Sequence, residues 1–285
     1  MVSQASVISA WAGERDALLR DGLTGTLLRA GRRVLSHGMG GLASTPATTA
    51  LVLWLILVWV VEVVALGPMH RSGPSELIAF GALPNARVGS SAGPGDWWRY
   101  VASTFLHDSG HPWQLLWNVA TLATVGSLVE KLHGPLVFAA SMLITAAAAS
   151  LFWVASAGLG VTSIPEFAVG ASGGICGVGG LVLAVGVGRR TGMPAQLRRR
   201  VVIQATPVVL ATALSGLLIT NVNNVAHIGG LIFGGLLGLL LPTRVAVGGR
   251  GLCPTERMVL TAVVGAGIVA VVIAGVHASG GLIRS

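Results

Sequence analysis

The stretch Val169-Gly170-Ala171-Ser172-Gly173-Gly174 opens an apolar run that reaches Gly188. A second stretch, Asn223-Asn224-Val225-Ala226-His227-Ile228-Gly229-Gly230, opens another apolar run further along the chain. A serine hydroxyl is a weak nucleophile until a base lies beside it, and histidine has the pKa for that task. We therefore predict a Ser172/His227 site near one face of a membrane.

The composition excludes an ordinary soluble domain. Of the 285 residues, 53% are hydrophobic and 10% are charged, whereas a soluble domain carries roughly 25% charged residues. The net charge of +8 comes from basic residues between apolar runs, so we expect a lipid bilayer and no nucleic acid as the partner. The two cysteines, Cys176 and Cys253, form neither a disulfide framework nor a zinc site.

Apolar segments of the length that a membrane requires, about 20 residues, recur along the chain. The predicted spans are 47–66, 113–129, 135–159, 172–188, 201–220, 225–241 and 258–276. The proline-rich stretch 67–112 holds no span, and its Trp-Trp-Arg-Tyr cluster is typical of a membrane interface. We predict an all-α polytopic membrane helical bundle of about seven transmembrane helices. It divides into an N-terminal cytoplasmic tail (1–46), a six-helix core (47–241), and a cytoplasmic loop with an additional C-terminal helix (242–285).

The distribution of basic residues predicts the orientation. With the N-terminus in the cytoplasm, the inner segments carry 14 Lys and Arg residues and the outer segments carry 4. That bias agrees with the positive-inside rule, and we expect a multi-pass protein of the cell membrane. Ser172 and His227 then begin their spans at the outer face, at a similar depth.

Several neighbouring residues fit an acyl-transfer site. Gln114 and Asn118 are four residues apart, so both side-chain amides share a helix face as candidate oxyanion donors. Gly230 and Gly234 allow a close helix contact. The two spans contain no Asp or Glu, which predicts a dyad. The structural alternative is that small residues and amides simply pack helices together.

Other polar residues have ordinary interpretations. Glu62 lies in the first span and has no obvious partner, whereas Glu130 and Lys131 are expected to form a cytoplasmic cap and loop anchor. We expect His133 and His277 to be solvated. The spacing of His, Asp and Glu predicts no metal site and no cofactor.

Together these pieces resemble the rhomboid family of intramembrane serine proteases. The matching pieces, in order, are Trp98-Arg99, His107, Asn118, Val129-Glu130-Lys131, Gly170-Ala171-Ser172-Gly173 and Ala226-His227-Ile228-Gly229-Gly230. The last span resembles the additional helix of the six-plus-one members. The resemblance implies a cofactor-independent endopeptidase with Ser172 as nucleophile and His227 as base. Asn118 and the Ser172 N–H would hold the oxyanion, and the substrates would be transmembrane proteins cut near the outer face.

Three features depart from the family pattern. Gln114 occupies the position of a histidine, although its amide still donates a hydrogen bond. The stretch between His107 and Asn118 is about two residues longer, so His111 substitutes if the helix starts early. Cys176 replaces an aromatic residue on which the histidine stacks, and we interpret it as an inert hydrophobe. The departures favour the alternative of a catalytically inactive rhomboid-like protein that binds client transmembrane helices. A transporter would require internal repeats, and none is clear.

Overall fold

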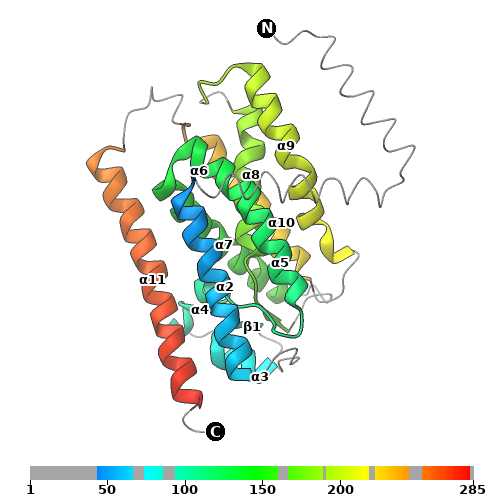
Figure 1. The fold of residues 1–285 in the computed structure, drawn as a ribbon, viewed down its shortest axis with the longest axis vertical. Coiled ribbons are helices and arrows are strands. Elements are labelled where there is room, and N and C mark those ends of the chain that lie inside the picture. The colour runs from blue at the N-terminus through cyan, green and yellow to red at the C-terminus, as the bar shows by residue number, and fades with distance from the viewer. Residues whose placement is uncertain are drawn as a thin grey trace.

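The computed structural model describes residues 44–66, 74–85, 94–159, 166–188, 191–217, 222–243 and 252–282. The tail predicted over residues 1–46 thus lies almost entirely outside the described residues. Within them the chain forms a helical bundle (Figure 1), which confirms the predicted fold class. Its helices are α2 (Pro46–Leu66), α5 (Pro112–Thr121), the π-helical turn η3 (Leu122–Gly126), α6 (Ser127–His133), α7 (Pro135–Gly158), α8 (Ser172–Val187), α9 (Ala195–Ala213), α10 (Asn224–Leu240) and α11 (Pro254–Leu282).

By length and composition, four of these described segments can cross a membrane: Pro46–Ala65, Pro135–Gly158, Ala195–Leu217 and Pro254–Ala278. Helices α8 and α10 are apolar but shorter. The prediction for the fifth span is wrong in its ends, because α9 both begins and stops earlier than 201–220. Pro194 is the N-cap residue of α9, and the first turns carry three arginines, of which Arg199 and Arg200 are exposed while Arg198 donates to the Gly188 carbonyl oxygen. A run of apolar residues marks only the part of a helix that can lie in lipid, so a prediction based on it misses a polar first turn.

Helix α8 lies at the centre of the bundle and packs most closely on α10 (Figure 1). A Cβ at Gly230 would overlap the carbonyl oxygen of Gly173, and one at Gly234 would overlap the carbonyl oxygen of Gly177. Only glycine permits this approach, so the predicted close contact between these two helices is confirmed.

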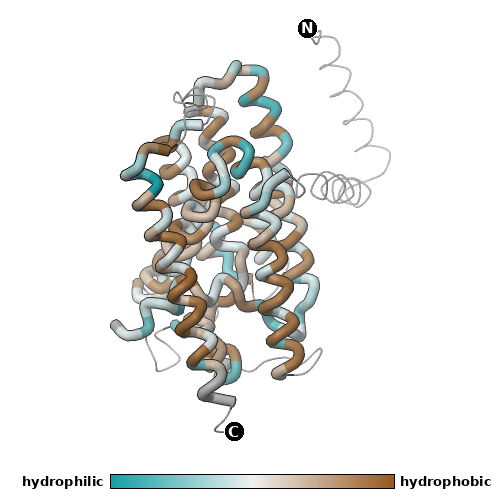
Figure 2. The backbone as a smooth tube through the Cα atoms, turned by 60° about the vertical axis from the view of Figure 1, so that its left-hand side comes forward, coloured by the Kyte–Doolittle hydropathy of each residue, from teal (hydrophilic) through white to brown (hydrophobic). Residues whose placement is uncertain are grey.

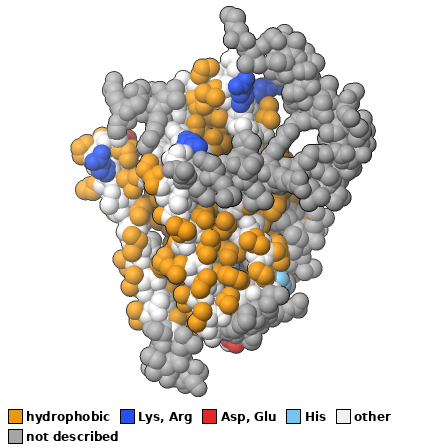
Figure 3. Space-filling model, viewed as in Figure 1, with side chains coloured by type: hydrophobic (Ala, Val, Ile, Leu, Met, Phe, Trp, Pro, Cys, Tyr) orange, Lys and Arg blue, Asp and Glu red, His pale blue; other side chains and the backbone are white. Residues whose placement is uncertain are grey.

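The outer faces of the helices are apolar. Hydrophobic residues run along the helices in Figure 2 and cover the middle of the face seen in Figure 3, where the visible Lys and Arg side chains lie near the upper end. Leu57 of α2, Leu236 of α10 and Val272 of α11 are each more than half exposed. A surface of this kind is compatible with lipid and incompatible with water over so large an area.

Within its described parts, residues 74–85 and 94–111, the segment between α2 and α5 contains no spanning helix, as predicted. It holds the short helices α3 (Pro74–Phe80) and α4 (Arg99–Ala102), the 3₁₀ turn η2 (Pro94–Asp96) and strand β1 (Leu83–Pro84). Strand β1 pairs antiparallel with β2 (Phe167–Ala168), and Leu83 lies opposite Ala168. This pairing ties the segment to the residues that lead into α8.

Trp98, in this segment, contacts α11. Trp98 is 2% exposed and stacks on His277 of α11, with 5.2 Å between ring centroids. His277 is exposed, as expected, although one face of its ring packs on Trp98. Trp98 itself is packed inside the protein. Arg99 lies over the same tryptophan and donates to the carbonyl oxygens of Ile78 and Ala82.

Glu130 caps the start of α2, a contact that the sequence did not predict. Its carboxylate accepts hydrogen bonds from the backbone N–H groups of Ala47 and Thr48 and from the Thr48 hydroxyl, at 2.7–3.0 Å. These N–H groups have no partner inside the helix, so a buried carboxylate satisfies them. His133 is buried, with Nδ1 donating to the Pro242 carbonyl, which corrects the expectation that it is solvated.

Candidate active site

Ser172 is the first residue of α8, and the backbone before it is held from two sides. Strand β2 ends at Ala168, and Gly170 donates its N–H to the carbonyl oxygen of Ser103 at 3.0 Å. Gly170 has φ +106°, a conformation that L side chains rarely adopt. The glycine therefore makes the turn that brings the chain out of the strand and into the helix at Ser172.

His227 lies in the first turn of α10 and is 1% exposed. Asn223 caps this helix, because its Oδ1 accepts the N–H of Ala226 at 3.0 Å. The Nε2 atom of His227 is 2.7 Å from the Oγ of Ser172. The structure thus brings together the two residues that the sequence paired, and they hydrogen-bond across the closely packed α8 and α10.

The other ring nitrogen of His227 faces no carboxylate. Among the described residues Nδ1 has no hydrogen-bond partner. Nε2 can accept the Ser172 hydroxyl when the single proton of the neutral ring is on Nδ1. In the part of the chain that the structure describes, no aromatic ring pairs with His227. Cys176 is buried, in agreement with its interpretation as a small hydrophobe.

Both candidate oxyanion amides lie beside the turn that precedes Ser172. A Cβ built on Gly170 would come within 3.1 Å of Gln114 Nε2 and 3.8 Å of Asn118 Nδ2. The two side chains therefore point from the same face of α5 toward the same backbone. His111 does not replace Gln114, because it precedes α5 and its Nδ1 is 2.7 Å from the Asp108 carboxylate.

A small cavity of about 20 Å³ lies next to the serine. Its lining includes Ser103, Thr104, Ser150, Ser172 and Asn223. The Nδ2 atom of Asn223 is buried and has no hydrogen-bond partner in the structure. Sequence reasoning missed this donor, although its position four residues before His227 places both on one helix face. Ser150 carried no signal, because nothing in the sequence distinguishes it from other small residues of its span.

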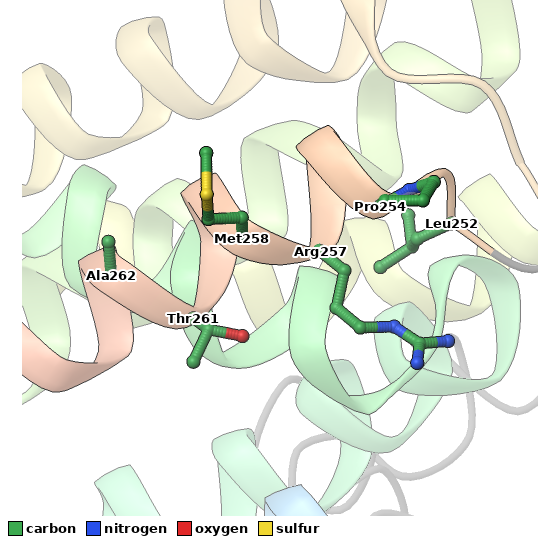
Figure 4. A pocket seen from close by; sticks show the side chains of 6 residues that line it. All are labelled: Leu252, Pro254, Arg257, Met258, Thr261 and Ala262. Carbon is green, nitrogen blue, oxygen red and sulfur yellow. The ribbon is translucent and has the colours of Figure 1, made fainter.

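A second hollow, of about 690 Å³, lies at the start of α11 and shares no residue with the cavity at Ser172 (Figure 4). Its lining residues are Leu252, Pro254, Arg257, Met258, Thr261 and Ala262. Within the described ranges, no three His, Cys, Asp or Glu residues gather in a way that could hold a metal ion.

Comparison with known proteins assigns the class. Residues 94–244, more than half of the chain, match the model of the Rhomboid domain. The chain is 30% identical over 239 residues to Rhomboid protease AarA of Providencia stuartii, covering 78% of this chain and 82% of that protein. It is 31% identical over 177 residues to Rhomboid protease GluP of Bacillus subtilis (strain 168), covering 61% of this chain and 31% of that protein.

The chain belongs to the rhomboid family, and it is a multi-pass membrane protein. The resemblance stated from the sequence motifs is confirmed. The matched residues begin at η2 and end just after α10, so they contain Ser172, His227 and both amides of α5.

Proposed function

We propose that this chain is an intramembrane serine endopeptidase that uses a Ser172/His227 dyad to cut transmembrane proteins. The observation that carries the proposal is the 2.7 Å contact between Ser172 Oγ and His227 Nε2, which is partly buried within an apolar bundle. Two relatives named as rhomboid proteases support the same reaction class.

In the proposed reaction, Ser172 Oγ attacks the scissile carbonyl carbon while its proton passes to Nε2 of His227. A C–O bond forms, and the carbonyl electrons move to the oxygen as an oxyanion. The C–N bond then breaks, and the leaving nitrogen takes the proton from His227. Water attacks the resulting ester and loses a proton to His227, and Ser172 takes that proton back as the ester bond breaks.

The oxyanion would lie among N–H donors at the turn before α8. The backbone N–H of Ser172 has no partner inside the helix, since first-turn N–H groups never do. Asn118 and Gln114 supply side-chain N–H groups beside Gly170. Such donors are effective because they are fixed before charge develops, in a site that excludes water.

The proposed setting is the cell membrane, with the N-terminus in the cytoplasm and Ser172 toward the outer face. The excess of Lys and Arg in the segments assigned to the inside supports this orientation. The proposed substrates are transmembrane segments cut near that outer face, and the lipid bilayer is the medium in which they meet the enzyme.

The proposal is tested with a panel of single-span reporter proteins, tagged at both ends and co-expressed with the wild-type chain or with Ser172→Ala. We expect a cleaved product from at least one reporter, ending near its outer membrane boundary, with wild type alone. Equal cleavage with Ser172→Ala would overturn the mechanism. Intact reporters that co-purify with both forms would favour the client-binding alternative.

A further inference from the structure

A buried carboxylate lies in α2 where the sequence offered it no partner. Glu62 is 1% exposed, and both of its oxygens accept the backbone N–H of His107, at 3.1 and 3.2 Å. Among the described residues it has no Lys or Arg partner. A buried carboxylate without a cation is costly, so its position requires an explanation beyond helix packing.

His107 connects Glu62 to α5. Its side chain is fully buried, and Nδ1 donates to the carbonyl oxygen of Phe105 at 3.3 Å. The other ring nitrogen, Nε2, therefore accepts, and the Nδ2 of Asn118 donates to it at 2.9 Å. Burial lowers the pKa of His107 to about 4, so the ring is neutral at pH 7 and keeps this acceptor.

The contact with His107 fixes which way the Asn118 amide points. An amide group has two N–H donors on one nitrogen. One N–H of Asn118 is directed at His107, so the plane of the amide and the direction of the second N–H are set. That nitrogen lies beside Gly170, in the turn that leads to Ser172.

We propose that Glu62 and His107 are positioning residues that hold the Asn118 amide in place for the oxyanion. Consecutive hydrogen bonds join the Glu62 carboxylate of α2 to the His107 backbone N–H, and the His107 ring to the Asn118 side chain. This inference rests on the proposed function, because it assigns Asn118 the role of an oxyanion donor. It gives α2, which contributes no reacting group, a part in the geometry of the site.

The experiment measures the second-order rate of labelling by a fluorophosphonate probe on the purified full-length chain. In this reaction Ser172 Oγ bonds to phosphorus as its proton passes to His227, the P–F bond breaks and fluoride leaves, and the phosphoryl oxygen takes the place of the oxyanion. Glu62→Leu removes the acceptor for the His107 N–H, and we expect labelling to slow about 10-fold or more, toward the loss from removing one oxyanion donor. Glu62→Gln keeps an acceptor oxygen and should stay within about 3-fold of wild type.

The matched control is Glu130→Leu, which removes the other buried carboxylate that contacts α2. It should lower the melting temperature, but at a temperature where it is folded it should label at close to the wild-type rate. Equal slowing by Glu130→Leu and Glu62→Leu would overturn the inference, because general loosening of α2 would then explain both.

A double-mutant cycle separates positioning from stability. If Glu62 acts through Asn118, Glu62→Leu should cause little further slowing in an Asn118→Ala background. Fully additive losses would overturn the inference. His107→Phe, which keeps a ring but removes the Nε2 acceptor, should reproduce the loss of Asn118→Ala, and wild-type rates in that variant would also contradict it. Failure of the wild-type chain to label at all, with Ser172→Ala equally silent, would count against the proposed function instead.

Discussion

Single polar side chains determine the geometry around Ser172, because the surrounding bundle is apolar and offers few competing partners. Several of these polar side chains lie close to Gly170. Its positive φ turns the backbone into α8, and its missing Cβ leaves room for the amides of Gln114 and Asn118. Any side chain at this position would be strained and would contact Gln114 Nε2 at 3.1 Å.

Gln114 is the residue at which this chain departs from the family pattern. If its amide donates to the oxyanion, Gln114→Ala should slow cleavage or probe labelling by about 10- to 1000-fold with an unchanged melting temperature. Gln114→His, which restores a ring N–H donor, should retain activity. A wild-type rate in Gln114→Ala would return Gln114 to a packing role.

Asn223 has two separable contacts, which predict different outcomes for two substitutions. Its Oδ1 caps α10, and its Nδ2 is an unpaired donor beside the Ser172 cavity. Asn223→Asp keeps the capping oxygen but loses the donor, so it should slow cleavage with little change in stability. Asn223→Ala should show the same slowing and also lose about 1 kcal/mol of stability. Normal cleavage by Asn223→Asp would show that the free N–H contacts no substrate.

At the scale of elements, the contact between α8 and α10 sets the distance between nucleophile and base. Gly234→Ala would place a methyl group on the Gly177 carbonyl oxygen, so the helices must separate. Overpacking of this kind typically costs about 1–3 kcal/mol, and we expect a lower melting temperature together with loss of labelling. Gly265→Ala in α11 is the control, because its added methyl group meets nothing within 4 Å. Equal behaviour of the two variants would contradict this account of the contact.

The sequence alone predicts those features of the helices that depend on local apolar length, and it does not predict contacts between distant segments. Apolar length predicted the ends of α2, α7, α8 and α10 to within one residue, because lipid imposes that length directly. It misplaced α9, whose arginine-bearing first turns are helical but not apolar. The Ser172/His227 pairing followed from glycine spacing and helix depth. The contacts of Glu62, Trp98 and His277 could not be predicted, because each joins distant segments whose approach is set by packing rather than by a local pattern.

At the scale of the whole molecule, the proposed orientation can be tested with the two native cysteines. Cys253 is exposed and precedes α11, at the end assigned to the cytoplasm, whereas Cys176 is buried. A membrane-impermeant maleimide should label Cys253 only after cells are permeabilised. Leu159→Cys, at the exposed end of α7, should be labelled in intact cells when combined with Cys253→Ser. Labelling of Cys253 in intact cells would reverse the topology.

The central claim is that Ser172 is an activated nucleophile whose base is His227. The most direct measurement is fluorophosphonate labelling of the purified chain, with wild type beside Ser172→Ala and His227→Ala. The account predicts covalent labelling of wild type at Ser172 and none in either variant, with all three samples equally folded. A folded wild type that does not label, or a Ser172→Ala variant that labels equally, would contradict it.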